Sequence, residues 1–265
     1  MLAKELIAEI TDQESNRPGE KIALCSSEAF TTLCGPNGAA HLTAFLMAFE
    51  PSFPVQALLI IREFTDLVES MYLQSVRFGN EKGPFQHYVK SRKRWVENLF
   101  QGIKILENNL GESLLLEYQN DNFDILEYCD HLLPLPPGLL RQASALVSPT
   151  AKPSLKTQAV LTYKTQIEAA VGFPFERHKL VSAMASGSFF DNDVRRYTLY
   201  SPEFRRQTYD SFMQIARAQN AAGYVDAFSH YRCRDLPHYD LEFGLLDQAD
   251  LEKIVENRPK LMLGS

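Results

Sequence analysis

The residues best suited to hold a ligand lie in one glycine-containing turn, Cys34-Gly35-Pro36-Asn37-Gly38. A short run rich in apolar and β-branched residues, 29–33, precedes the turn, and an apolar-rich segment without a helix breaker, residues 39–49, follows it. This order is typical of a strand, a tight turn and a helix. Glycines in such a turn let the backbone approach a nucleotide-like ligand, and the amides at the helix start donate to it. A plain connection with Pro36 in the first helical turn explains the same residues without a ligand.

Residues 31–40 resemble a degenerate first motif of class I S-adenosylmethionine-dependent methyltransferases, which is commonly written D/E-x-G-x-G-x-G. The resemblance extends over residues 20–165 and lies mainly in the order of the elements. It implies that Glu63, after an apolar run, holds the ribose hydroxyls, and that a polar residue after a later strand lies near the adenine. The implied S-adenosylmethionine site consists of Cys34, Gly35, Pro36, Asn37, Gly38, Glu63, Asn120 and Asp121.

Methyl transfer needs few catalytic side chains, because the sulfonium of the cofactor already supplies the leaving group. The enzyme mainly aligns a nucleophile with the methyl carbon. Tyr128 and His131 follow the predicted strands closely enough to position a substrate or to act as a general base. The first hypothesis is therefore methyl transfer from S-adenosylmethionine to a protein or small-molecule acceptor.

A second hypothesis uses Cys34 as a nucleophile. A helix N-terminus favours a thiolate, and the Cys34-Gly35-Pro36 opening resembles the nucleophile helix of papain-like cysteine peptidases. That resemblance implies a histidine followed by an acidic or amide residue later in the chain, for which His238 and Asp240 are the candidates. This constellation predicts a cysteine hydrolase or transferase.

A third hypothesis is a binding protein without catalysis. Lys90, Arg92, Lys93 and Arg94, with Trp95 beside them, would suit an acidic partner, although a charged run on a helix is commonly a solvated face. Asp226 and His230 have helical spacing, but two metal ligands without a third favour a surface pair. No metal site is predicted.

The predicted elements alternate between strands and helices up to residue 165. Strands are expected at residues 21–25, 29–33, 55–61, 113–118, 123–128 and 158–163, and helices at residues 39–49, 64–78, 85–106 and 139–147. This alternation predicts an α/β fold with a Rossmann-like doubly wound sheet over residues 1–165. Residues 166–265 are predicted to form a mainly helical part that covers the cleft, with possible strands at 197–200 and 239–243.

Composition narrows the class of protein. The 265 residues are 45% hydrophobic and 23% charged, which is typical of a globular protein. A formal net charge of −6 disfavours nucleic acid as a partner. The four cysteines are widely spaced, and no apolar run approaches the roughly 20 residues of a membrane helix. The prediction is a cytoplasmic protein with no membrane association and a small-molecule or protein substrate.

Overall fold

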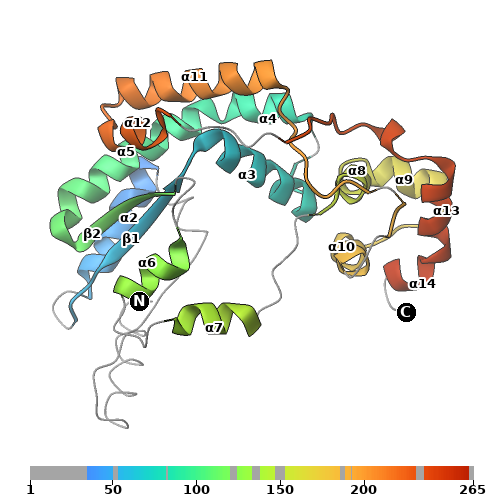
Figure 1. The fold of residues 1–265 in the computed structure, drawn as a ribbon, viewed down its shortest axis with the longest axis horizontal. Helices are drawn as coiled ribbons and strands as arrows, with labels where there is room; N and C mark the ends of the chain where they lie inside the picture. The colour runs from blue at the N-terminus through green and yellow to red at the C-terminus, as the bar shows by residue number, and fades with distance from the viewer. Residues whose placement is uncertain are drawn as a thin grey trace, which may run out of the picture. The chain divides into compact units, whose positions relative to one another are not determined.

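The computed structural model describes residues 35–49, 53–81, 83–119, 124–132, 138–146, 153–185, 189–191, 193–230 and 236–262. These residues form two compact units (Figure 1). Unit 1 draws on the segments up to Arg62, Arg92–Asn120 and Phe212–His230, and unit 2 on Glu63–Ser91, Asp121–Ser211 and the segment from Tyr231 onward. Each unit is thus assembled from distant parts of the chain. The division predicted at residue 165 falls inside helix α9 (Lys164–Val171) of unit 2.

Unit 1 is built around two parallel strands, β1 (Ala57–Arg62) and β2 (Leu114–Gln119). Their register pairs Ala57 with Leu114 and Arg62 with Gln119. Three further helices complete the unit: α2 (Pro36–Met47), α5 (Lys93–Leu110) and α12 (Ala222–Phe228). A 3-10 turn, η2 (Gly111–Ser113), joins α5 to β2, and the last residues of α11 (Pro202–Ala218) belong to this unit.

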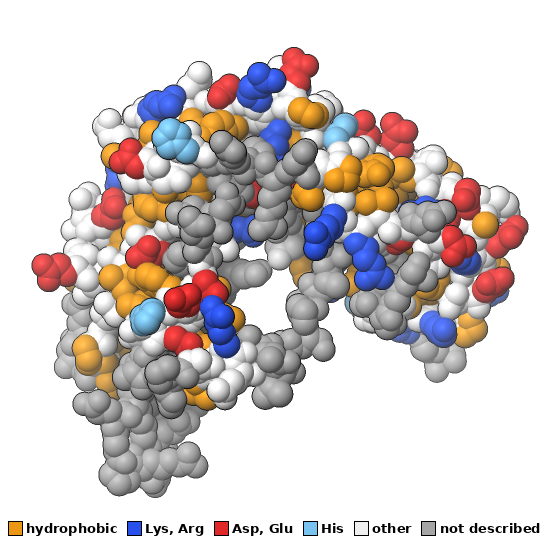
Figure 2. All heavy atoms as spheres, viewed as in Figure 1, with side chains coloured by type: hydrophobic (Ala, Val, Ile, Leu, Met, Phe, Trp, Pro, Cys, Tyr) orange, Lys and Arg blue, Asp and Glu red, His pale blue; other side chains and the backbone are white. Residues whose placement is uncertain are grey.

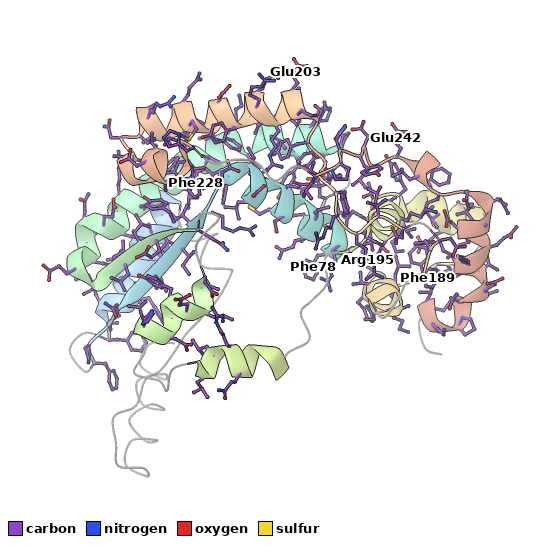
Figure 3. The ribbon with its side chains drawn as sticks, in the orientation of Figure 1. Phe78, Phe189, Arg195, Glu203, Phe228 and Glu242 are labelled. Atoms are coloured by element: carbon purple, nitrogen blue, oxygen red, sulfur yellow. The ribbon has the colours of Figure 1, made fainter. Side chains whose placement is uncertain are left out.

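The core of unit 1 follows from the spacing of apolar residues on α5. Val96, Leu99 and Ile103 recur at three- and four-residue steps and are buried, as expected for one stripe of an amphipathic helix. The Tyr118 ring of β2 lies against the rings of both Tyr224 and Phe228 of α12, which also contact each other. Figure 3 labels Phe228 on this helix. Aromatic burial of this kind is a large share of the stabilisation of a small unit.

The regular elements that the structure describes in unit 2 are α-helices, with a 3-10 turn and an isolated β-bridge besides. Its helices are α3 (Phe64–Phe78), α4 (Phe85–Ser91), α6 (Ile125–Leu132), α7 (Leu139–Leu146), α8 (Leu155–Thr162), α9, α10 (Arg177–Ala185), the first part of α11, α13 (Gln248–Glu256) and α14 (Arg258–Leu261). The other features are the 3-10 turn η3 (Phe243–Leu245) and a parallel bridge between Thr198 and His238. Figure 2 shows acidic side chains gathered over α13.

Helix α8 forms the centre of unit 2. Leu155, Ala159 and Val160 are buried, and so are Thr157 and Gln158 on its other sides. Arg177 of α10 donates to two backbone carbonyl oxygens, Val76 O at 2.6 Å and Leu161 O at 2.8 Å, and so joins α10 to α3 and α8. Lys156 Nζ pairs with Asp250 at 2.7 Å and joins α8 to α13.

The predicted Rossmann-like doubly wound sheet is wrong. The described chain is mainly helical, and its one sheet has two parallel strands. The predicted strand at 158–163 lies in α8, and the strand at 123–128 lies largely in α6. A helix buried on every side shows the same continuous apolar run as a buried strand, which explains the error at α8. At α6, the Asp124 carboxylate accepts from the Leu126 and Glu127 amides and starts a helix.

Other elements are as predicted. The apolar runs at 55–61 and 113–118 form β1 and β2, which pair with each other in parallel. The helices predicted at 39–49, 64–78 and 139–147 are α2, α3 and α7, while the segment 85–106 is divided between α4 and α5. Residues 197–200 and 239–243 form no strand beyond the Thr198–His238 bridge. The strands predicted at 21–25 and 29–33 lie outside the described residues.

Candidate anion-binding site

The carboxyl end of the sheet in unit 1 gathers the starts of two helices. Because β1 and β2 are parallel, Arg62 and Gln119 lie at the same end. Helix α5 leads directly into β2 through η2, so it runs opposite to the strands and its first turn lies at this end. Helix α2 precedes β1 and packs against α5, which brings its first turn there as well (Figure 1). Ligands of parallel α/β sheets bind at this end of the strands.

The first turn of α2 is open to a ligand. Gly35 is the N-cap, with φ −71° and ψ 164°, and no side chain caps the helix. The first turn contains no acidic residue, and a Cβ placed on Gly35 would meet no atom of the described residues within 4 Å. The amides of an uncapped first turn carry partial positive charge and need acceptors. This turn therefore offers amide donors to an external anion.

The first turn of α5 adds full positive charge. Arg92 is its N-cap, no side chain caps the helix, and no acidic residue lies in the first turn. Lys93 and Arg94 are exposed, as is Arg62 at the end of β1. Among the residues that the structure describes, none forms an ion pair with Arg62, Lys93 or Arg94. We call this set the cationic end: Gly35, Asn37, Gly38, Arg62, Arg92, Lys93 and Arg94.

Positive charge at helix N-termini is normally reduced by acidic first-turn residues, since each such residue gains about 0.3–1 kcal/mol there. The cationic end does the reverse, because it places basic side chains in and beside two first turns that contain no acidic residue. Their mutual repulsion costs free energy in the isolated protein. A bound anion would remove this cost, so the arrangement is suited to an anionic ligand.

Glu63 lies at the N-terminus of α3 in unit 2 and is buried. Its Oε1 accepts from the Thr65 amide at 2.9 Å, and its Oε2 accepts from the Asp66 amide at 3.1 Å and from the Thr65 hydroxyl. Burial raises the pKa of this carboxyl group above its usual value, against the opposing effect of these donors. The structure thus places Glu63 in a helix cap, where both oxygens are already occupied.

The remaining residues of the predicted cofactor site divide into two sets. Pro36, Asn37 and Gly38 form the first turn of α2, next to Gly35. Cys34, Asn120 and Asp121 lie outside the described residues. The candidate catalytic residues Tyr128 and His131 lie on α6 of unit 2, where Tyr128 is half-buried and His131 is exposed.

The two later residues of the cysteine hypothesis lie close together in unit 2. His238 Nε2 is 3.4 Å from Asp240 Oδ1, and the His238 backbone forms the bridge to Thr198. Because Cys34 lies outside the described residues, the hypothesis of a Cys34 nucleophile stays a prediction.

The basic residues predicted as a surface for an acidic partner, Lys90 and Arg92 to Arg94, are divided between two helices. Lys90 belongs to α4, whereas Lys93 and Arg94 begin α5. No group of three or more potential metal ligands occurs within the described ranges. Sequence reasoning missed Arg62, because it assigned the end of this strand to Glu63. The available signal was a charged residue directly after a buried apolar run.

Comparison with known proteins gives no relative: no family model, curated protein or solved structure matches the chain. Within the described part of the chain, no helix is long and apolar enough to span a membrane.

Proposed function

We propose that the protein binds a small phosphate-bearing ligand of the nucleotide class at the cationic end of unit 1. The observation that carries the proposal is the coincidence of two uncapped helix N-termini with Arg62, Lys93 and Arg94 at the carboxyl end of a parallel strand pair. A phosphate has several acceptor oxygens and a double negative charge, so it can accept from backbone amides and basic side chains together.

A small ligand is favoured over a nucleic acid polymer. The chain has a net charge of −6, and a polyanion would be repelled by the acidic remainder of the molecule at distances beyond the basic residues. A compact phosphate ester needs only a local positive field. Gly35, with open space at its Cβ position, permits the close approach that such a ligand requires.

The same charge pattern bears on the methyltransferase hypothesis. S-adenosylmethionine carries a cationic sulfonium and no phosphate, so basic side chains at the strand ends would weaken its binding. Methyl transfer and S-adenosylmethionine binding stay predictions from the sequence, as does the choice of protein or small-molecule acceptor. Adenosine 5′-diphosphate and S-adenosylhomocysteine therefore make a discriminating pair of probes.

The fluorescence of Trp95 can report ligand binding at the cationic end. Trp95 is the single tryptophan of the chain and lies in the first turn of α5, directly after Arg94 of the cationic end. We expect the emission of Trp95 to change in a saturable way when adenosine 5′-diphosphate or inorganic pyrophosphate is added to the full chain. We expect the affinity to fall as salt is raised, because exposed charges are screened. S-adenosylhomocysteine at the same concentrations is expected to produce no change.

The matched variants are Arg94→Glu, which reverses a charge in the first turn of α5, and Lys104→Glu, which makes the same change farther along that helix. We expect Arg94→Glu to weaken binding tenfold or more, equivalent to about 1.4 kcal/mol, and Lys104→Glu to leave it within about twofold. Equal affinities in the two variants would exclude the cationic end as the site where the phosphate binds. Saturable binding of S-adenosylhomocysteine with no response to the phosphates would instead support the cofactor predicted from the sequence.

A further inference from the structure

Helix α2 of unit 1 is a surface helix without a charged residue. Residues 36–49 contain no Asp, Glu, Lys or Arg, and the polar side chains among them are those of Asn37, His41 and Thr43. A helix that is apolar on all sides is normally buried, whereas a surface helix normally carries charged residues on its outer face. Helix α2 follows neither pattern, because its uncharged outer face is exposed.

The exposed residues of α2 form one stripe. Ala39 and Thr43 are buried, and the helix packs against α5. The other side of α2 is exposed at the three- and four-residue steps of a single helix face. This face consists of Asn37, Ala40, His41, Ala44, Met47 and Ala48, which we call the α2 stripe. The stripe begins in the cationic end, which contains Asn37, and becomes apolar toward Met47, which is 47% exposed.

The neighbouring helix α5 shows what an ordinary surface helix of the same unit exposes. Beyond its basic first turn, the exposed residues of α5 are Glu97, Gln101, Glu107, Asn108 and Asn109. Such side chains are well hydrated. The α2 stripe instead holds mainly apolar atoms in water along a helix about 18 Å long. Contact with an apolar partner would be more favourable than this exposure.

Two aromatic side chains extend the apolar surface at the end of α2. Phe45 and Phe49 follow His41 at four-residue steps and therefore lie along the edge of the stripe. Their ring centres are 5.1 Å apart, and both side chains are half-buried. The partner of the stripe is therefore expected to be apolar near Met47.

The charge at the other end of the stripe selects the kind of partner. Arg62, Lys93 and Arg94 are exposed there, and none of the described residues forms an ion pair with them. A second copy paired through the stripe would bring another cationic end, and a purely apolar partner would bring no anion. The surface of an anionic bilayer offers phosphate groups and acyl chains side by side.

The length of the uncharged segment agrees with a helix that lies on a bilayer. Residues 36–49 span 14 positions, fewer than the roughly 20 that cross a membrane and typical of a buried or an interfacial segment. The exposure of the α2 stripe excludes the buried alternative. The net charge of −6 opposes anionic lipid as it opposes nucleic acid. A bilayer, however, also accepts the apolar face, so its binding does not depend on charge alone.

We propose that α2 is a membrane-surface helix: the α2 stripe lies in the interface of an anionic bilayer, and Arg62, Lys93 and Arg94 contact lipid phosphate groups. The inference rests on the proposed function in one respect, because both place phosphate at the cationic end. It adds a membrane as a source of that phosphate. A soluble phosphate ester and a lipid headgroup then compete for the same donors.

Flotation of the full chain with vesicles tests the membrane-surface helix. Vesicles of equal parts phosphatidylcholine and phosphatidylserine should bind the wild type, and vesicles of phosphatidylcholine alone should bind it about tenfold less or weaker still. Met47→Glu should lower binding to the anionic vesicles by about tenfold or more, because it places a charge in the apolar face. Val255→Glu is the matched control. Val255 is 46% exposed on α13 of unit 2, so this variant adds the same charge elsewhere and should bind like the wild type.

The Trp95 titration separates this inference from the proposed function. Met47→Glu should keep the response to adenosine 5′-diphosphate, because Met47 is the last residue of α2 and the cationic end lies at its first turn. That response also shows that the variant is folded. Arg94→Glu should weaken binding to both the vesicles and the nucleotide. A response to the nucleotide without vesicle binding by the wild type would overturn the membrane-surface helix and leave the proposed function standing.

Two further results would decide the matter. Equal vesicle binding by the wild type and Met47→Glu would overturn the membrane-surface helix, as would a dimer of the wild type that Met47→Glu converts to a monomer in the absence of lipid. Vesicle binding that Met47→Glu and Arg94→Glu abolish, with no response to soluble phosphates, would support the membrane-surface helix and contradict the small ligand of the proposed function. Circular dichroism then shows whether these variants are folded.

Discussion

The cationic end of unit 1 and a cluster of carboxyl groups in unit 2 differ in where the partners of their charges lie. We call this cluster the acidic layer; it consists of Glu63, Asp66, Glu69, Thr198, Tyr200 and Arg205. In the acidic layer, carboxyl groups are buried and accept from the chain's own amides, hydroxyls and one guanidinium. At the cationic end, Arg62, Lys93 and Arg94 stand exposed beside helix starts that lack acidic residues. Charges whose partners lie within the chain contribute to stability, whereas charges left open cost stability and are available to a ligand. The comparison thus separates a structural cluster from a candidate binding site.

The largest effect on stability is expected when a hydrogen-bond acceptor of the acidic layer is removed. Glu69→Ala leaves the Leu199 amide and the Thr198 hydroxyl buried without their acceptor. We expect the free energy of unfolding to fall by about 2–4 kcal/mol, measured by chemical denaturation. The control is Glu252→Ala on α13, an exposed residue that accepts from the Gln248 side chain, with an expected loss below about 0.5 kcal/mol. Equal losses would show that Glu69 is not a fastening group.

Tyr197 and Tyr200 allow a second comparison, between a buried hydroxyl with a hydrogen-bond partner and one without a partner among the described residues. Tyr197 donates to Pro153 O at 3.1 Å, whereas the Tyr200 hydroxyl has no partner in the described structure. Tyr197→Phe should lower the free energy of unfolding by about 1 kcal/mol. Tyr200→Phe removes a buried hydroxyl that is not satisfied and should leave stability unchanged or slightly higher. A large loss in Tyr200→Phe would mean that the hydroxyl has a structural role.

Charge reversal at the cationic end should raise stability while it weakens binding. In Arg94→Glu an acidic residue replaces a basic one in the first turn of α5, where the helix end favours negative charge. We expect a gain of about 0.3–1 kcal/mol in the free energy of unfolding at low salt. The gain should decrease as salt is added. A loss of stability would show that Arg94 is held by the fold and is not reserved for a ligand.

The smallest expected effect concerns Gly35. Its φ of −71° can be adopted by any residue, and no atom of the described residues lies within 4 Å of its Cβ position. Gly35→Ala should therefore cost less than about 1 kcal/mol of stability, as a change of N-cap residue. The added methyl group occupies the space proposed for the phosphate, so the affinity for adenosine 5′-diphosphate should fall several-fold in the Trp95 titration. Unchanged affinity would place the ligand away from α2.

The glycine-containing turn shows how far sequence reasoning reached. Its position at the start of a helix, and the two apolar runs that form parallel strands, were predictable because each depends on local spacing and turn chemistry. The strand predicted at 158–163 failed because an apolar run reveals burial without revealing the element that is buried. Glu63 was predicted as a ribose ligand from its position after a strand. An acidic residue at that position can equally be the N-cap of the next helix. Only the hydrogen bonds of its two oxygens distinguished the cap.

The sequence by itself determined the two strands β1 and β2 and the helices α2, α3 and α7, because caps, turns and apolar periodicity act between residues close in the chain. It also determined that the basic residues 92–94 follow one another. Only the tertiary structure decided that these residues lie at the same end of the sheet as Arg62 and the first turn of α2, since the parallel pairing of β1 and β2 brings distant segments to one end. Likewise, Glu69 and Leu199 are 130 residues apart, and their contact depends on packing that no local pattern encodes.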